Sequence, residues 1–167
     1  MEKRDTPRFL CDEMLKRLAR WLRIMGYDVS DPEVGSDQEI IQMSKDENRI
    51  ILTRDKDLSN NRSPEAIRII SDDLDSQIRE LLERFPQEEF PPGNTRCPTC
   101  NGELSDRPPS SLVIYGKARM DIPEDVIREH EFVYVCTSCG KVYWIGSHWN
   151  GIRSRLDRFG VTPKLPG

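Results

Sequence analysis

The sequence predicts an α/β fold followed by a small second domain that is rich in cysteine. Over the first 85 residues, short apolar runs of strand length alternate with longer segments of helical spacing. Strands that alternate with helices predict a parallel sheet with helices on its faces. Four of the five cysteines follow a segment at 86–95 that contains three prolines and a glycine. We therefore expect a domain at 8–86, a linker at 87–95 and a second domain at 96–159 that ends in a helix.

The individual elements are predicted from periodicity and from helix start and stop signals. Residues 13–25 place apolar side chains at helical spacing and end before Gly26. Ser36 and Glu39 form a capping box that predicts a second helix. A further helix is expected at 74–85, with its apolar residues on one side. Apolar runs of strand length lie at 9–11, 49–53 and 66–70.

Composition narrows the class of protein. No apolar run approaches the roughly 18 residues of a membrane helix, and the first residues carry no apolar signal core. We therefore expect a cytoplasmic protein without a membrane partner, in which cysteines serve metal binding or catalysis and not disulfides. The net charge of −4 gives no bulk attraction to nucleic acid, so such binding would need a local basic patch.

Two CxxC pairs predict a zinc site. Cys97 and Cys100 form the first pair, and Cys136 and Cys139 form the second. Two residues between thiols let both sulfurs reach one ion, and four thiolates give a closed tetrahedral shell, so the zinc would be structural. A pair of redox CxxC motifs, or unrelated buried thiols, is the alternative, but redox motifs of the thioredoxin type need a βαβ setting, which this half lacks. Cys11 lies in an apolar run and is expected to be a small core residue.

Aspartates follow the apolar runs of the first half. Asp12, Asp55 and the pair Asp72 and Asp73 each come after a predicted strand. The carboxyl ends of parallel strands meet at one edge of a sheet, where ligands bind. Carboxylates gathered there would repel one another unless they held a hard cation such as Mg²⁺ or Mn²⁺, which positions water for phosphodiester hydrolysis. Each aspartate also precedes a helix, so N-capping is the alternative interpretation.

Basic and aromatic residues offer candidate contacts to RNA. At about 100° per residue, Lys16, Arg20 and Arg23 are expected on one face of the first helix, opposite its apolar stripe. This face could guide a phosphate backbone toward Asp12, or it could be an ordinary solvated face. Residues 141–149 predict the closing strand of the cysteine-containing domain. Within them, His148 and Trp149 could contact nucleic acid, although a lone histidine between Ser and Trp is more often a packed or capping residue.

Four segments together resemble the Mut-seven C-terminal RNase domain family. They are residues 9–28 (FLCDEMLKRLARWLRIMGYD), 51–57 (ILTRDKD), 97–102 (CPTCNG) and 139–149 (CGKVYWIGSHW). The resemblance implies a PIN-like nuclease domain fused to a zinc ribbon. It also implies that Asp12, Asp37, Asp55 and Asp73 form the acidic site, with Asp57 or Asp72 as possible replacements for Asp55 or Asp73. Residues 106–120 match no motif of the family.

Two functions remain in competition on this basis. The first is a metal-dependent ribonuclease with structural zinc and a catalytic Mg²⁺ or Mn²⁺, in which the ribbon helps to bind RNA. The second is a non-catalytic RNA- or ribosome-binding protein, in which the aspartates only cap helices. A toxin-like nuclease paired with an antitoxin is a third, weaker hypothesis, because a fused zinc ribbon is unlike a minimal toxin.

Overall fold

The computed structural model of the chain describes residues 4–33, 36–60, 64–114, 117–118 and 122–167. Its first half is built on a four-stranded parallel sheet in the order β2-β1-β3-β4. The strands are β1 (Arg8–Cys11), β2 (Asp28–Ser30), β3 (Ile50–Thr53) and β4 (Ala66–Arg68). The helices are α1 (Lys16–Met25, after the 3-10 turn Glu13–Leu15), α2 (Asp37–Glu47), α3 (Lys56–Ser59) and α4 (Leu74–Arg84).

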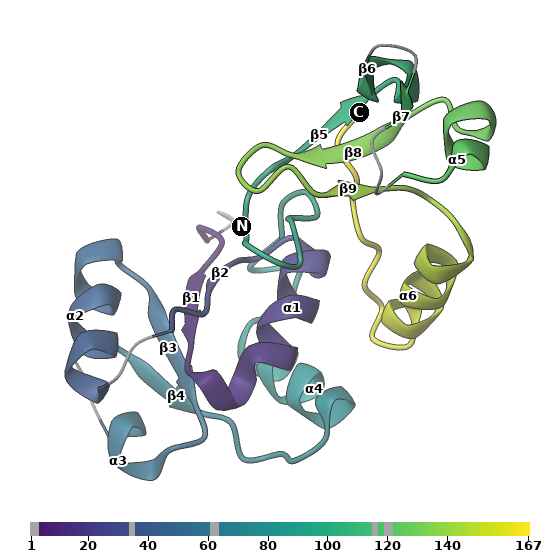
Figure 1. Ribbon diagram of the computed structural model, residues 1–167. Helices are drawn as coiled ribbons and strands as arrows, with labels where there is room; N and C mark the ends of the chain where they lie inside the picture. The colour runs from purple at the N-terminus through teal and green to yellow at the C-terminus, as the bar shows by residue number, and fades with distance from the viewer. Residues whose placement is uncertain (1–3, 34–35, 61–63, 115–116, 119–121) are drawn as a thin grey trace.

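Helices cover both faces of this sheet (Figure 1). Phe9, Cys11 and Leu52 point into the larger core with α1 and α4, while Leu10 and Ile51 pack with residues of α2 and α3. Alternate strand residues point to opposite faces, so continuous apolar runs are required when both faces are covered. The α/β prediction is confirmed. The structure adds β2 and α3, which are too short and too polar to show a period in the sequence.

The second half contains a three-stranded antiparallel sheet in the order β5-β8-β9. Its strands are β5 (Leu104–Arg107), β8 (Val133–Cys136) and β9 (Val142–Tyr143). The region between β5 and β8 holds a 3-10 turn (Pro109–Leu112), β6 (Val113–Ile114), β7 (Lys117–Ala118) and α5 (Glu124–Glu129). Of the unmatched segment 106–120, residues 115–116 and 119–120 lie outside the described residues.

The final helix, α6 (Ser147–Asp157), packs back onto the first half of the chain. Trp149, Ile152 and Leu156 recur at helical spacing and contact the larger core together with Phe159 and Val161. Helix α6 also corrects the prediction that residues 141–149 form one strand. Strand β9 ends at Tyr143, and His148 and Trp149 belong to the helix, because their neighbours bury apolar surface only at helical spacing.

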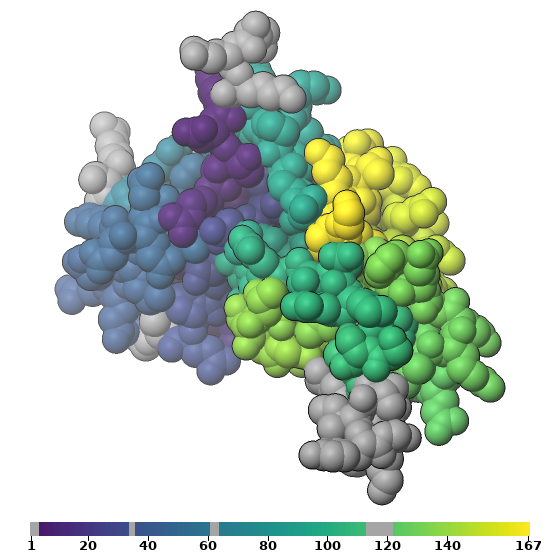
Figure 2. Space-filling view, turned by 90° about the horizontal axis from the view of Figure 1, so that it is seen from above, coloured from purple at the N-terminus to yellow at the C-terminus, as the bar shows by residue number. Residues whose placement is uncertain are grey.

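Residues 86–95 do not stand apart from the rest of the molecule. The N–H of Gly93 donates to the carbonyl of Gly26 (3.1 Å), and the Thr95 hydroxyl donates to the carbonyl of Ile24 (2.8 Å). The N–H of Thr95 donates to the carbonyl of Lys164 (2.6 Å), and the C-terminal residues lie against this segment in the space-filling view (Figure 2). The domain boundaries at 8–86, 87–95 and 96–159 remain a proposal, because the connecting segment contacts both α1 and the C-terminal residues.

Candidate metal centre and acidic sheet edge

The four predicted cysteines form one cluster. The sulfurs of Cys97, Cys100, Cys136 and Cys139 all lie within 4.8 Å of one another. The Cys97 and Cys139 sulfurs are 3.7 Å apart, and those of Cys100 and Cys136 are 3.4 Å apart. Thiolates at roughly 2.3 Å from a tetrahedral zinc would be roughly 3.8 Å apart. The cluster therefore could hold zinc, with no open position for a catalytic water.

Tight turns after each cysteine pair bring the backbone close to the sulfurs. A Cβ built on Gly102 would lie 2.7 Å from the Cys136 sulfur, so only glycine fits there. Gly140 adopts a left-handed conformation with φ of 74°, which glycine tolerates without strain. The N–H groups of Ser138 and Cys139 each donate to the Cys136 sulfur at 3.4 Å. The residues that directly follow each cysteine pair therefore determine how the backbone approaches the sulfurs.

The same geometry affects the acidity of the thiols. Burial raises the pKa of Cys136, but the N–H groups of Cys139 and Ser138 outweigh burial and lower this pKa to about 7. Burial raises the pKa of the neighbouring Cys100 to about 12. Only the thiolate binds metal, so the lowered pKa of Cys136 favours its role as a zinc ligand.

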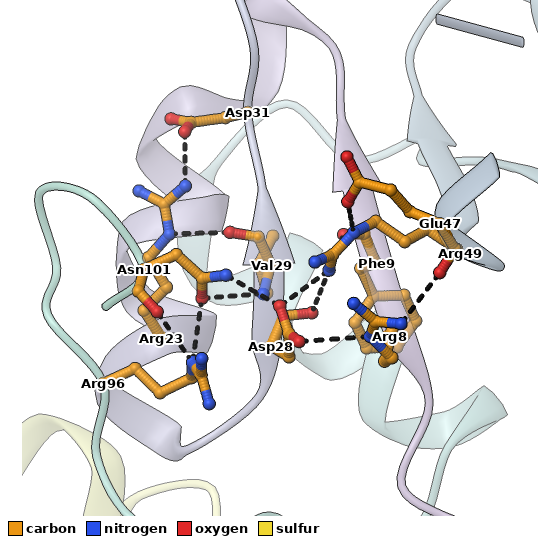
Figure 3. A network of polar contacts seen from close by, with 10 residues as sticks. All are labelled: Arg8, Phe9, Arg23, Asp28, Val29, Asp31, Glu47, Arg49, Arg96 and Asn101. Atoms are coloured by element: carbon orange, nitrogen blue, oxygen red, sulfur yellow. Dashed lines mark hydrogen bonds and ion pairs between the residues drawn. The ribbon is translucent and has the colours of Figure 1, made fainter. Parts of the chain in front are cut away.

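Arg23 connects α1 to the first cysteine pair and to β2, and Figure 3 shows its contacts with Val29 and Asp31. Its side chain is buried, and its guanidinium donates to the carbonyls of Val29 (2.8 Å) and Pro98 (3.1 Å). It also forms an ion pair with Asp31. This position corrects the prediction of an exposed basic face that includes Arg23. The guanidinium is buried because it donates to backbone carbonyls that would otherwise be buried without donors.

Asn101 makes a second connection between the cysteine cluster and the sheet (Figure 3). Its side-chain oxygen accepts from the N–H of Val29 (3.0 Å), and its side-chain nitrogen donates to Asp28 (2.7 Å). Asp28 also accepts from Arg49 (2.7 Å) and pairs with Arg8 (3.1 Å). This network was not predicted from the sequence, because its partners are distant in the chain; the local signal was the Asn101-Gly102 pair after Cys100, where Asn101 adopts a left-handed conformation.

Asp12 and Asp55 lie just after the carboxyl ends of β1 and β3, the two central strands of the parallel sheet. The chain passes from β1 to β2 on one side and then to β3 on the other, so the strand order reverses between β1 and β3. Asp12 directly follows β1 and is buried, with 8% of its surface exposed. It accepts from the Thr53 hydroxyl at the end of β3 and from the N–H of Arg54 (3.3 Å). Ligands of open α/β sheets bind at this kind of reversal.

Three of these aspartates also cap helices. Asp12 accepts from the N–H of Met14 (3.0 Å), at the start of the turn before α1. Asp55 accepts from the N–H groups of Asp57 (2.6 Å) and Leu58 (2.9 Å), at the start of α3. Asp73 accepts from the N–H of Ser76 (3.0 Å), at the start of α4. Capping is thus part of what these residues do.

Asp37 and Asp72 have different surroundings. Asp37 is the exposed first residue of α2, which is capped by Ser36. Asp72 is exposed and forms an ion pair with Arg54. Among the described residues, the four cysteines are the only group of three or more metal-binding side chains whose ligand atoms lie within 4.8 Å of one another. The convergence of Asp12, Asp37, Asp55 and Asp73 on one ion therefore stays a prediction.

Of the remaining candidates for RNA contact, Lys16, Arg20 and His148 are exposed and Trp149 is half-buried. Lys16 pairs with Glu33 at 3.1 Å. Buried Cys11 has the core position expected of it. Within the described ranges, no helix has both the length and the apolar character needed to cross a bilayer.

Comparison with known families gives one result. The model of the Mut7-C RNAse domain family matches residues 7–156. The chain belongs to this family. The match runs through the parallel sheet, the cysteine cluster and almost all of α6, so the family includes both halves of the molecule. Membership in an RNase domain family indicates a nuclease-like function. A search of curated proteins found no match.

Proposed function

We propose that this protein is a metal-dependent ribonuclease whose active site is the acidic edge of the parallel sheet. The observation that carries the proposal is the position of Asp12. It is a buried carboxylate at the reversal of strand order, and hydrogen bonds from the neighbouring strand end fix its orientation. A residue needed only to cap a short turn does not require hydrogen bonds from the end of a neighbouring strand.

The donor set at this edge fits a hard divalent cation. Carboxylate oxygens suit Mg²⁺ or Mn²⁺, and Asp12, Asp37, Asp55 and Asp73 are the residues that would hold it. Such an ion supplies Lewis acidity toward the phosphodiester and orients a water. Thr53 and Arg54 would keep the Asp12 carboxylate in place. Asp57 is exposed on α3 beside Asp55, whereas the ion pair of Asp72 with Arg54 makes Asp72 less available.

The cysteine cluster has a different role in this proposal. Four thiolates leave zinc no open position, so zinc would stabilise the fold and take no part in the reaction. The cluster would hold the ribbon and α6 beside α1 through Arg23 and Asn101. The protein would then have a soft structural metal site and a hard catalytic one.

Asparagine substitutions can separate catalysis from capping. Asn caps helices about as well as Asp, but it lacks the charge that binds a cation. We expect Asp12→Asn and Asp55→Asn each to lower the rate of RNA cleavage with Mn²⁺ by at least about 100-fold, while the melting temperature changes little. Cleavage of labelled single-stranded and structured RNA, with and without EDTA, measures the effect.

Asp125→Asn is the matched control, because Asp125 is an exposed aspartate in the first turn of α5, outside the proposed site. Its activity should equal that of the unmodified protein. Full activity in both Asp12→Asn and Asp55→Asn would exclude the proposed active site.

The capping bonds favour a second candidate, a non-catalytic RNA- or ribosome-binding protein. In that case the aspartates only stabilise helix starts, as their hydrogen bonds to N–H groups allow. RNA binding would then depend on salt and would be unchanged by Asp55→Asn. Neither the unmodified protein nor a variant would cleave RNA. Association with an antitoxin is a separate question. Co-purification of this protein with the products of neighbouring genes would test it.

A further inference from the structure

A groove lies between α1, the three-stranded sheet and α6. It has a volume of about 650 Å³. Its walls combine aromatic rings with basic side chains from segments that are far apart in the sequence. They include Arg17, Arg20, Trp21, Trp144, His148 and Trp149. None of them belongs to the cysteine cluster or to the acidic edge.

Three tryptophans give the groove flat apolar walls. Trp144 is half-buried and packs on the core of the second domain, and Trp149 is half-buried and packs on the larger core. Both rings are therefore anchored on one side while they line the groove on another. The Arg155 guanidinium lies over the Trp21 ring, 4.9 Å from its centroid, and holds this third ring in place. Rigid aromatic surfaces of this kind are suited to stacking with a planar ligand.

The basic residues of the groove have no acidic partner. The side chains of Arg17 and Arg20 are exposed, and neither forms an ion pair or hydrogen bond with any residue that the structure describes. By contrast, Lys16 on the same helix pairs with Glu33, and Arg23 pairs with Asp31. In a chain with a net charge of −4, two adjacent unpaired arginines beside aromatic walls form a local site for an anion.

The start of α6 adds to this positive character. Gly146 and Ser147 line the groove, and no side chain caps the N-terminus of the helix. Helix N-termini attract phosphate because their first N–H groups lack intrahelical partners. The groove thus places planar apolar surfaces beside three independent features that favour a negative charge: Arg17, Arg20 and the start of α6.

We propose that this groove binds single-stranded RNA, with one unpaired base stacked on Trp144 or Trp149 and the adjoining phosphate held by Arg17 and Arg20. The inference rests on the proposed ribonuclease function and defines its substrate as unpaired RNA. Bases in a duplex are stacked on one another and cannot enter an aromatic groove, whereas splayed bases can. Helix α1 follows Asp12 after one 3-10 turn, and its residues Arg17, Arg20 and Trp21 line the groove, so bound RNA would extend along α1 toward the acidic edge.

The test measures binding separately from cleavage. Fluorescently labelled 12-nucleotide oligouridine and a hairpin of equal length are titrated into the zinc-loaded protein in EDTA-free buffer without added Mg²⁺ or Mn²⁺. We expect the single strand to bind at least about 10-fold more tightly than the hairpin and to quench tryptophan fluorescence.

The double variant Arg17→Gln/Arg20→Gln should weaken binding about 10-fold and reduce the slope of log affinity against log salt by about one to two. Trp144→Ala should also weaken binding about 10-fold, and Trp144→Tyr should restore most of it.

Arg153→Gln is the matched control, because Arg153 is an exposed arginine on α6 that does not line the groove. It should bind single-stranded RNA as the unmodified protein does. Equal affinities for all variants, or tighter binding of the hairpin, would overturn the proposal. Binding of a proline-rich peptide with no binding of RNA would also overturn it and would assign the groove to a protein partner.

Cleavage assays distinguish this proposal from the ribonuclease proposal. If Asp12→Asn binds oligouridine normally but does not cleave it, both proposals are supported. If the unmodified protein binds RNA in the groove but never cleaves it, the ribonuclease proposal fails and the groove stands as a binding site. If the protein cleaves RNA and the groove variants leave KM unchanged, the groove proposal fails alone.

Discussion

Arg23 illustrates how one buried charge can connect two parts of a chain. Its guanidinium reaches from α1 to the carbonyls of Val29 and Pro98 and to Asp31. A buried charge is tolerated only when it is paired and hydrogen-bonded. Asp31 supplies the paired charge, and the carbonyls of Val29 and Pro98 accept the hydrogen bonds. Removing it would leave several acceptors without a donor, one of them in the first cysteine pair.

We expect Arg23→Met to lower the free energy of unfolding by about 3 kcal/mol, because it leaves the Asp31 carboxylate and the carbonyls of Val29 and Pro98 without their cation. Urea denaturation followed by circular dichroism measures the change. Arg20→Met is the matched control, three residues earlier on the same helix, exposed and without a partner among the described residues. Its stability should stay within about 0.5 kcal/mol of the unmodified protein. Equal stability of the two variants would contradict a structural role for Arg23.

At the scale of elements, β2 is held in place by the contacts of Asp28 as well as by its short pairing with β1. Asp28 accepts from Arg49 and Asn101 and pairs with Arg8, so it connects β2 to β1, to the start of β3 and to the first cysteine turn. Burial raises the pKa of Asp28, but the hydrogen bonds from Arg49 and Asn101 outweigh burial and lower this pKa to about 2.

This lowered pKa predicts a pH dependence of stability. A carboxyl group with a lower pKa in the folded state stabilises the protein above its unfolded pKa of 3.8 and loses this contribution as the pH falls to about 2. The difference in unfolding free energy between the unmodified protein and Asp28→Asn should therefore be constant near neutral pH and shrink between about pH 4 and about pH 2. Denaturation at a series of pH values measures it. A difference that persists unchanged to about pH 2 would show that Asp28 does not act as a carboxylate in this network.

At the scale of the whole molecule, the two halves are joined by direct contacts as well as by the connecting segment. Arg23 and Asn101 attach the first cysteine pair to α1 and β2, and α6 shares the larger core with α1 and α4. Arg155 on α6 also bonds to Asp75 on α4 (2.8 Å). A metal bound at the cysteines would therefore stabilise more than the ribbon that surrounds it.

We expect removal of zinc with a chelator to weaken the contacts between the two halves. Hydrogen exchange should accelerate at residues 23–31, where the first cysteine pair is attached, and change much less in α2 on the opposite face of the sheet. Mass spectrometry of exchanged peptides, with and without chelator, measures both regions in one experiment. Unchanged protection at 23–31 after complete loss of zinc would show that the contacts do not depend on the metal.

Local sequence determined the elements that carry their own signal. The cysteine pairs, the long amphipathic helices and the apolar strands could be identified because spacing and periodicity act over a few residues. The position of the aspartates after strands was also evident. Their distances from one another were not, since they depend on the strand order and on how each carboxylate is used by its own helix start.

Only the tertiary structure decided the places where distant segments meet. β2 exists because β1 lies beside it, Arg23 is buried because the first cysteine pair supplies carbonyls for it, and residues 147–157 form a helix that packs on α1 and α4. The groove of Arg20 and Trp144 likewise exists only once α1, β9 and α6 are assembled. The physical reason is the same in each case. A single sequence displays local periodicity and spacing, whereas burial and hydrogen bonding depend on partners that the sequence separates by tens of residues.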